Sequence, residues 1–356
     1  MSLDELRKRI DALDTQILER LNQRAKCAMD IGEIKRSTNA VYYVPERERA
    51  VFDKLRERNA GPLTDNAIQA IYREVMSAVR SLEKATTVAF LGPQATFSHM
   101  AARRIFGVNA EYHPMPTLVD IFTEVERKRV DYGVVPVESS MGGGVSDTLD
   151  RFVSSDLKII NEILLHIRQN LIAKCQLEAI TTIYSKDNAF AQCRNWLKAN
   201  LPSAKLVDAS STAEAARIAA LEENAAAIGA ALAAETYGLD IVVESIEDSP
   251  NNFTRFFVIG QQAAKPTGND KTSVIMSAKD RPGALYGLLV PFSDAGVNLT
   301  RIESRPSRKK VWEYVFFVDM LGHIDDPDVR GALERVAEQC TEFKVLGSFP
   351  QGRIEE

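Results

Sequence analysis

Cysteine and histidine are scarce in this sequence, with four of each among 356 residues. The cysteines lie far apart, with no CxxC pair, at positions 27, 175, 193 and 340. This distribution argues against a disulfide framework or a zinc site and fits a reducing cytosol. The histidines are not spaced like metal ligands either, so we expect no metal and no other cofactor.

Long apolar runs and a strong excess of one charge are also missing. No stretch approaches the roughly 18 uncharged apolar residues that a membrane span requires. The first residues, MSLDELRKRI, are charged from the start, so we expect no export signal and a cytoplasmic protein. The formal net charge is −5 and no long basic run occurs, which argues against nucleic acid or a membrane surface as a partner.

The sequence does contain three segments that differ in the periodicity of their apolar residues. Residues 1–86 carry only a helical period, whereas residues 87–262 alternate β-rich runs with helical stretches and predict an α/β domain. Residues 263–271 are polar, contain Pro and Gly, and predict a linker. Over 272–356 the order strand, helix, strand, strand, helix, strand predicts a ferredoxin-like α+β domain. We therefore expect a multidomain chain.

The helical segment opens with an apolar stripe that recurs in steps of three and four. A helix of more than 30 residues would be about 45–50 Å long, too long for a domain of this size to cover. Such a stripe predicts a second copy of the chain as partner, and hence a homodimer. It runs through Leu3, Leu6, Ile10, Leu13, Ile17 and Leu21 and continues at Ala28, Ile31 and Ile34.

Charged side chains lie on or beside the core-facing rows of these helices. Arg24 stands in the stripe where a leucine would be expected, and Lys35 continues that face. Buried cations are costly unless an anion meets them. The alternative is a helical dimerisation module whose charges are solvated or paired with one another. The residues concerned are Arg7, Arg24, Lys35, Arg47, Glu48 and Glu83.

The stretches LRKRIDALD, QRAKCAMDIGEIK and YYVPERE resemble the all-helical class of chorismate mutases. The resemblance implies a domain of three-helix chains intertwined as a dimer, which would explain the long first helix. It also implies that Arg24, Arg47 and the partner's Arg7 hold the two carboxylates of chorismate.

The same resemblance implies that Lys35 and Glu83 face the ether oxygen whose bond breaks, and that Glu48 takes the ring hydroxyl. These residue types suit a Claisen rearrangement, which needs a flexible dianion held in its reactive conformer and charge on the departing oxygen stabilised. Val44 stands where some members have a carboxylate, so one hydroxyl contact is missing. Glu83 stands where Gln is common, and a glutamate donates only when protonated. Mutase activity favouring acidic pH is therefore predicted, unless burial raises the pKa of Glu83.

Three elements of the α/β segment indicate a substrate site. After the first β-rich run, a Gly-Pro turn is followed by Thr96 and Ser98, which suit an anion site or a plain helix cap. The strand predicted over Tyr132–Glu138 is followed by three glycines, which favour close approach of a ligand or a flexible turn. In NNFTRFFVIG, alternation puts Thr254 on the face opposite Arg255.

Together these elements resemble prephenate dehydratase, most specifically in the Thr-Arg-Phe signature of residues 254–256. The resemblance implies that Thr254 is the proton donor for the leaving hydroxyl, or its hydrogen-bond relay. Arg255 or helix-start amides near Ser98 would bind carboxylate. The implied substrate-binding residues are Thr96, Ser98, Glu138, Ser139, Arg255 and Phe256.

The implied fold of this segment is a pair of α/β lobes around a cleft, like the type II periplasmic binding proteins. One lobe would comprise 87–163 with 246–262, and the other 164–245. Three parts of this segment depart from the family pattern. Ser139 replaces a usual asparagine, Ala95 replaces a usual glycine, and Ser-Lys-Asp-Asn at 185–188 stands where the family often has Ser-His-Pro-Gln. Alanine at position 95 would be strained if φ is positive there.

In the last segment, DRPGAL (280–285) and LTRIESRP (299–306) resemble the ACT domain in its phenylalanine-binding version. The resemblance implies edge-to-edge pairing of two copies and an allosteric phenylalanine site. The alternative is a folding or dimerisation appendage without a ligand. The implied effector-site residues are Gly283, Ala284, Leu285, Glu303, Ser304, Arg305 and Pro306.

The three resemblances occur in one order and name consecutive steps of one pathway together with its end product. We therefore expect a bifunctional enzyme that rearranges chorismate to prephenate, converts prephenate to phenylpyruvate, and is inhibited by L-phenylalanine. Two alternatives remain: a ligand-binding or transport receptor that holds prephenate-like acids without turnover, and a phenylalanine- or prephenate-binding regulatory protein that has lost an activity.

Overall fold

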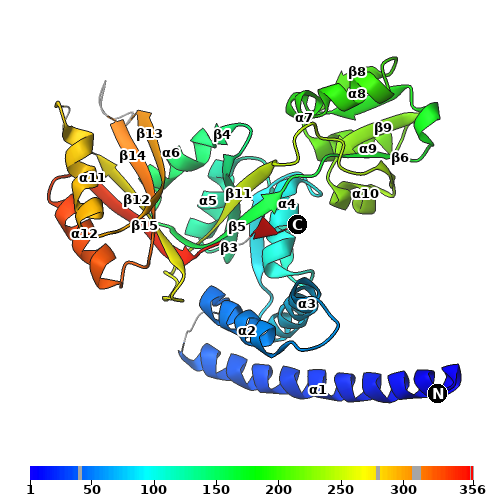
Figure 1. Ribbon diagram of the computed structural model, residues 1–356, viewed down its shortest axis with the longest axis horizontal. Coiled ribbons are helices and arrows are strands. Elements are labelled where there is room, and N and C mark those ends of the chain that lie inside the picture. Colours follow the sequence, from blue (N-terminus) through cyan, green and yellow to red (C-terminus); the bar gives the residue numbers. More distant parts are fainter. Residues whose placement is uncertain (39–41, 278–280, 307–313, 353, 356) are drawn as a thin grey trace. The chain divides into compact units, whose positions relative to one another are not determined.

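The computed structural model describes residues 1–38, 42–277, 281–306, 314–352 and 354–355. The chain forms two compact units (Figure 1). The first comprises residues 1–87 and 105–111, and the second comprises residues 88–104 and 112–356.

The first unit is built from three helices: α1 (Leu3–Thr38), α2 (Pro45–Arg58) and α3 (Asp65–Glu83). Proline opens α2, and the hydroxyl of Thr64 caps α3 by accepting a hydrogen bond from the Ala67 N–H.

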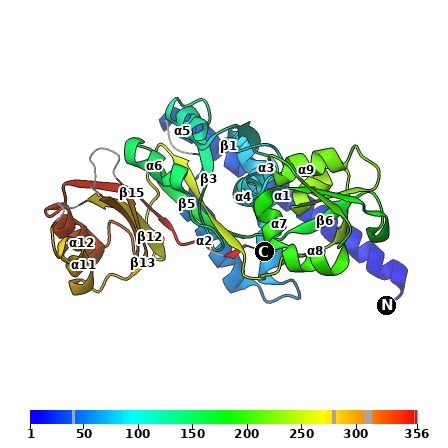
Figure 2. The ribbon, with the colours of Figure 1, turned by 90° about the horizontal axis from the view of Figure 1, so that it is seen from above.

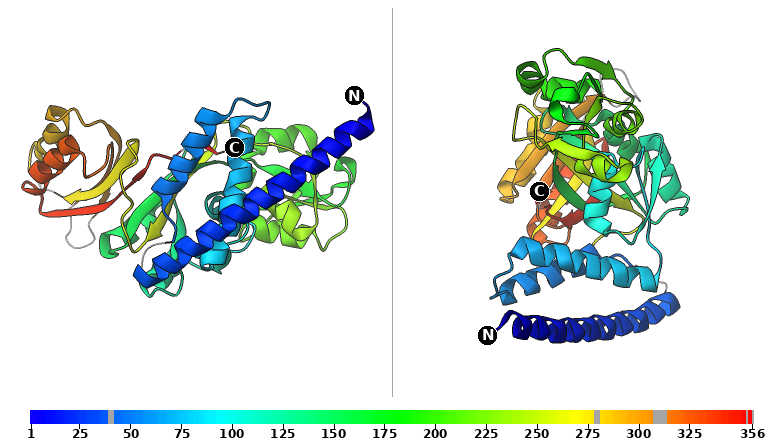
Figure 3. Two further views of the ribbon diagram at one scale, coloured as in Figure 1. Left: turned by 90° about the horizontal axis from the view of Figure 1, so that it is seen from below. Right: turned by 90° about the vertical axis from the view of Figure 1, so that its right-hand side faces the viewer.

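Helix α1 is one uninterrupted helix of 36 residues, as the apolar stripe predicted (Figure 3). The stripe stays open to solvent in the single chain, with Ile10 and Ile17 each 55% exposed. In α1 the only residue classed as buried is Gly32, where a Cβ would come within 3.1 Å of the Glu83 Cβ. Close contact between α1 and α3 is therefore concentrated near the end of α1.

The second unit begins with a lobe built on a mixed sheet of order β16-β5-β11-β3-β1-β2, with β4 paired to β3. Strand β11 returns from far along the chain and runs antiparallel to both β3 and β5. The strands are β1 (Thr87–Leu91), β2 (Glu111–Met115), β3 (Tyr132–Ser139), β4 (Gly143–Gly144), β5 (Lys158–His166), β11 (Phe253–Gly260) and β16 (Ile354–Glu355). The helices are α4 (Phe97–Phe106), α5 (Leu118–Glu126) and α6 (Ser146–Ser154).

The second lobe is the chain between β5 and β11. Its sheet has the order β10-β6-β9-β7-β8, from β6 (Asn170–Ala173), β7 (Thr182–Ser185), β8 (Lys205–Asp208), β9 (Ala225–Gly229) and β10 (Asp240–Val243). Its helices are α7 (Asp187–Gln192), α8 (Arg194–Asn200), α9 (Thr212–Ala219) and α10 (Ala231–Tyr237), with a short 3-10 turn at Leu177–Ala179. At the crossover, the side-chain oxygen of Gln192 accepts hydrogen bonds from Gln169 and Asn252 at 2.9 and 3.1 Å.

The C-terminal domain has the predicted ferredoxin-like order. It comprises β12 (Asp270–Ser277), α11 (Ala284–Asp294), β13 (Leu299–Pro306), β14 (Tyr314–Leu321), α12 (Pro327–Ala337) and β15 (Glu342–Pro350). The sheet order is β13-β14-β12-β15, so β13 and β15 are its edges. Both helices lie on one face of this sheet (Figure 2).

The other face of the C-terminal sheet shares a hydrophobic core with the first lobe. Phe317 and Phe349 of the C-terminal domain belong to the same buried cluster as Phe152 and Phe257 of the lobe. After β15 the chain continues into β16, which pairs in parallel with β5. The C-terminal domain is therefore packed on the lobe rather than only tethered to it.

Candidate active sites

A cavity of about 380 Å³ lies among the three helices of the first unit. It is lined by five of the six charged residues that the sequence had assigned to the mutase site, namely Arg24, Lys35, Arg47, Glu48 and Glu83. The sixth, Arg7, is on an exposed part of α1, 3.8 Å from Asp4. Val44 also lines the cavity, together with Tyr42, Met76, Val79 and Arg80.

The charged side chains of this cavity are partly paired with one another. The Lys35 ammonium lies 3.2 Å from the Glu83 carboxylate and donates to the Tyr42 carbonyl oxygen at 3.3 Å. Nη1 of Arg24 is buried and has no hydrogen-bond partner among the described residues. A buried guanidinium nitrogen without an acceptor is suited to an anionic ligand.

Sequence reasoning missed Arg80 at this site. Arg80 stands four residues after Met76 and three before Glu83, hence on the same face of α3, and this spacing could have revealed it. Its Nη2 lies 3.3 Å from the Glu48 carboxylate. Burial raises the pKa of Glu48, while the charges of Arg80, Arg73 and Arg24 oppose that rise.

In the second unit, topology brings the three expected dehydratase elements to one edge of the sheet. Strands β1 and β3 are parallel, so the loop after Leu91 and the end of β3 leave from the same side. Because β11 is antiparallel to β3, its first residues return there, and Thr254 lies opposite Ser139 in the register. Ligands of open α/β sheets bind outside the carboxyl ends of the strands.

The entry loop has the backbone geometry that the sequence flagged as costly. Ala95 has φ of 65°, in the left-handed region, and is fully buried against the second lobe with Ile172 and Ala213. Its N–H donates to Nδ1 of His99 at 3.1 Å, and the His99 ring stacks on Phe90 with centroids 4.5 Å apart. Burial, and then the charge of Arg103, lower the pKa of His99 to about 4.

The remaining entry-loop residues have local partners. The Thr96 hydroxyl accepts from the His99 N–H at 3.3 Å, which is the helix-cap arrangement considered as the alternative. It also lies 3.1 Å from the Leu91 and Pro93 carbonyl oxygens. Ser98 is buried in the first turn of α4, with 8% of its surface exposed.

Arg255 has a different environment from the one expected of a substrate-binding residue. Its Nε donates to Glu162 at 2.6 Å and its Nη1 donates to Asp319 of the C-terminal domain. The guanidinium is thus buried and neutralised by two carboxylates, so direct binding of a substrate carboxylate is not supported. Phe256 is likewise 2% exposed, which makes it a core residue rather than a substrate contact.

Glu138, another expected dehydratase residue, has a partly open side chain that is 40% exposed. The same carboxylate oxygen lies 3.2 Å from Nε of Arg301 and 3.9 Å from Nη1 of Arg255. Arg301 comes from β13 and also pairs with Glu303. A chain of ion pairs therefore runs from Glu303 to Arg255, the neighbour of Thr254.

The effector residues expected in the C-terminal domain divide between two faces of β13. Glu303 and Arg305 face the first lobe, where Arg305 donates to Ser146 at 2.7 Å and pairs with Asp150 at 3.2 Å. Ser304 and Pro306 are exposed on the opposite face. Gly283, Ala284 and Leu285 stand at the start of α11, where Gly283 has φ of 77°.

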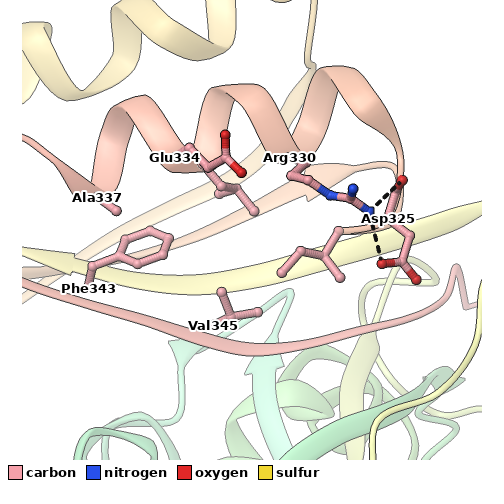
Figure 4. Close-up of a pocket in the computed structure, with 8 residues that line it drawn as sticks. Asp325, Arg330, Glu334, Ala337, Phe343 and Val345 are labelled. Atoms are coloured by element: carbon pink, nitrogen blue, oxygen red, sulfur yellow. Dashed lines mark hydrogen bonds and ion pairs between the residues drawn. The ribbon is translucent and has the colours of Figure 1, made fainter.

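A separate cavity of about 430 Å³ lies between α12 and β15 (Figure 4). Its walls are apolar, from Ala337, Phe343 and Val345, and at its rim Arg330 pairs with Asp325 at 3.3 Å. It contains none of the effector residues expected from the sequence.

None of the described helices combines the length and apolar character needed to cross a membrane. Within the same described residues, no group of three or more His, Cys, Asp or Glu side chains could hold a metal ion.

Comparison with protein families matches each part of the chain separately. Residues 6–84 match chorismate mutase type II, residues 88–264 match prephenate dehydratase and residues 272–338 match the ACT domain. The fold and the matches together define an enzyme in which a helical chorismate mutase domain, a two-lobed dehydratase domain and an ACT domain follow one another.

Full-length relatives have the same organisation. The bifunctional chorismate mutase/prephenate dehydratase of Aquifex aeolicus is 50% identical over 99% of each chain, and that of Stutzerimonas stutzeri is 44% identical over 98% of each. The crystal structure of a prephenate dehydratase from Arthrobacter aurescens in complex with L-Phe matches with a TM-score of 0.70 and 37% identity, covering 75% of this chain and 90% of that one. This chain belongs to the family of bifunctional chorismate mutase/prephenate dehydratases.

Proposed function

We propose that the chain rearranges chorismate to prephenate in its first unit and converts prephenate to phenylpyruvate in its second, under inhibition by L-phenylalanine. The observation that carries the proposal is the cavity of about 380 Å³ lined by Arg24, Lys35, Arg47, Glu48 and Glu83. Its volume is within the range of small-molecule sites, and its four cationic and two acidic side chains suit a dianion. The mutase domain comprises residues 1–86, the dehydratase domain residues 87–262 and the ACT domain residues 272–356. The linker 263–271 joins the last two domains.

In the mutase site, Arg24 and Arg47 bind the two carboxylates of chorismate. Lys35 and Glu83 act at the ether oxygen, where negative charge develops as the bond breaks, and Glu48 accepts a hydrogen bond from the ring hydroxyl. Preorganised charges of this kind stabilise the transition state without covalent chemistry. The unpaired Nη1 of Arg24 supports its role as a carboxylate ligand.

The mutase is proposed to work as a homodimer. The exposed stripe of α1 needs a partner surface, and a second α1 is the simplest one. In this arrangement the partner's Arg7 completes the binding of the substrate carboxylates.

In the dehydratase site, Thr254 donates the proton, directly or through a relay, to the hydroxyl that leaves as the ring carboxylate is lost. Glu138, Ser139, Thr96 and Ser98 lie on the elements that bound this site. Arg255 acts as a positioning residue, because its pairs with Glu162 and Asp319 fix the start of the strand that carries Thr254.

L-phenylalanine is proposed to bind the C-terminal domain at Gly283–Leu285 and at Glu303–Pro306. The Arthrobacter aurescens relative, a complex with L-Phe, supports this choice of effector. Glu303 begins the chain of ion pairs that reaches Arg255. Binding near Glu303 therefore has a physical route to the Thr254 strand.

The test is a coupled assay of the purified chain with chorismate, following chorismate loss and phenylpyruvate formation with and without phenylalanine. Formation of phenylpyruvate that falls on adding phenylalanine supports all three parts. Chorismate loss that stops at prephenate contradicts the dehydratase assignment and leaves a mutase fused to a binding protein. Turnover that ignores phenylalanine contradicts the effector assignment alone.

A further inference from the structure

Arg80 is the charged residue of the mutase cavity to which the proposed function assigns no role. It lies on α3, lines the cavity and is 6% exposed. A guanidinium this buried is costly unless its donors are satisfied, so its partners indicate what the site binds.

The partners of Arg80 account for only part of its guanidinium. Nη2 lies 3.3 Å from Glu48 and 3.4 Å from the Phe106 carbonyl oxygen. The flat group also lies over the ring of Tyr43, 5.1 Å from its centroid. Nη1 is buried, and in the described part of the chain it has no hydrogen-bond partner. An unmet buried donor destabilises the protein, and a ligand oxygen that accepts from Nη1 would remove that cost.

The ion-pair partner of Arg80 indicates which oxygen of the ligand would accept from Nη1. Arg80 is ion-paired with Glu48, the residue proposed to accept a hydrogen bond from the substrate's ring hydroxyl. A hydroxyl both donates and accepts, so it matches a carboxylate and a guanidinium held side by side. Val44 lines the same cavity and offers no such contact, although some family members have a carboxylate there.

We propose that Arg80 is a further substrate-contacting residue of the mutase, and that Arg80 and Glu48 together recognise the ring hydroxyl of chorismate. Glu48 accepts a hydrogen bond from the hydroxyl while Nη1 of Arg80 donates one to the hydroxyl oxygen. Pairing with Arg80 also keeps Glu48 from drawing Arg24 or Arg47 away from the substrate carboxylates. This proposal rests on the mutase function proposed above.

The electrostatics of the cavity give the proposal a second readout. Glu48 faces Arg24 from α1 and Arg73 and Arg80 from α3, and it shares the cavity with Arg47, Lys35 and Glu83. Glu48 accepts a charge-assisted hydrogen bond from the hydroxyl only when it is ionised, so this contact weakens as the pH falls through the pKa of Glu48. Because Arg80 lowers that pKa, its removal should move the acidic limb of the pH–rate profile to higher pH.

The experiment compares Arg80→Gln and Arg80→Lys with the control Arg73→Gln in the full-length chain. Arg73 is also an α3 arginine whose charge acts on Glu48, but it is not among the residues that line the cavity. The substrates are chorismate and an analogue in which hydrogen replaces the ring hydroxyl. We expect Arg80→Gln to lower kcat/KM for chorismate roughly 10- to 100-fold, with little further loss on the analogue. Arg73→Gln should shift the pH profile without discriminating between the two substrates.

Equal losses on both substrates would overturn the proposal. Arg80 would then have only a structural role, packed against Tyr43 and Phe106. Full activity of Arg80→Gln on chorismate would overturn it as well. Thermal melting and dehydratase turnover of added prephenate check folding, and if Arg80→Gln does not fold, Arg80→Lys is judged by the same pair of substrates. A wild-type chain without mutase activity would contradict the proposed function itself, which is a different outcome.

Discussion

The two units differ in where the partners of their charged residues come from. In the first unit, Lys35 pairs with Glu83 and Arg80 pairs with Glu48, all within three helices around one cavity. In the second, Arg255 pairs with Asp319, and so the residue next to Thr254 is held by the C-terminal domain. The charged pairs of the mutase cavity are thus made within the first unit, whereas the residue next to Thr254 is fixed by the C-terminal domain packed against its lobe.

The strongest way to break this comparison is to remove Lys35. Lys35→Met should lower mutase kcat about 10²–10³-fold, because the ether oxygen loses the charge that stabilises it in the transition state. Dehydratase turnover of added prephenate should stay at the wild-type level. Lys54→Met, an exposed lysine on α2, is the matched control and should change neither activity. A parallel fall of both activities in Lys35→Met would show that the two sites of one chain are not independent.

The converse test removes the carboxylate that the C-terminal domain presents to Arg255 of the dehydratase lobe, that of Asp319. Asp319→Asn should cost about 3–5 kcal/mol of unfolding free energy, because Arg255 stays buried with one of its two carboxylates gone. Dehydratase activity should be lost at lower urea concentration than in the wild type, while mutase activity is unaffected.

The control for this variant is Asp325→Asn, in the same domain. Asp325 and Arg330 form an exposed ion pair, 60% and 55% exposed, whose loss should cost only about 0–1 kcal/mol. Equal stability of the two variants would contradict the central place given to the Arg255–Asp319 pair.

The entry loop predicts a pH dependence confined to the second unit. Above its ordinary pKa of 6.5, His99 is neutral in both the folded and the unfolded chain. Between pH 6.5 and its lowered pKa of about 4, only the unfolded chain binds a proton at His99. Stability is therefore lost as the pH falls through this window and levels off below it. The expected loss is about 2 kcal/mol between pH 7 and pH 5.

His99→Asn removes the titrating group and keeps a hydrogen-bond acceptor for the Ala95 N–H. Urea unfolding at pH 7 and pH 5, followed through dehydratase activity, should show a smaller pH effect in this variant than in the wild type. An unchanged pH effect would assign the sensitivity to another group.

The smallest expected effect concerns inhibition by phenylalanine and tests the ion pair between Arg301 and Glu138. Arg301→Met should weaken inhibition by phenylalanine several-fold, because the ion-pair chain from Glu303 to Arg255 is interrupted at its centre. Arg330→Met, outside that chain, should keep wild-type inhibition. Phenylalanine binding measured by calorimetry should persist in both, and a full inhibitory response of Arg301→Met would remove this route.

Much of the mutase site could be predicted because a helix fixes which residues share a face. The steps of three and four that relate Arg24 and Lys35 to the apolar stripe are visible without any structure. Arg80 was missed although it follows the same rule, because an arginine on a surface helix is ordinarily solvated. Its burial depends on Tyr43 and Phe106, which no local spacing connects to it.

The dehydratase site could be predicted only in part, because its contacts join residues far apart in sequence. The signature around Thr254 and the strand before Ser139 come together at one end of the sheet, and Ala95 has the positive φ that the sequence analysis considered. The pair of Arg255 and Asp319 joins residues 64 positions apart and two domains, and no periodicity announces it. The pairing of β16 with β5 is equally long-range.

The most direct test of two independent active sites in one chain is the Thr254→Ala variant, supplied with chorismate at neutral pH. We expect chorismate to disappear at the wild-type rate, prephenate to accumulate, and phenylpyruvate to form about 10²-fold or more slowly. Phenylpyruvate formed at near the wild-type rate would contradict the role of Thr254, and a matching fall in chorismate consumption would contradict the independence of the two sites.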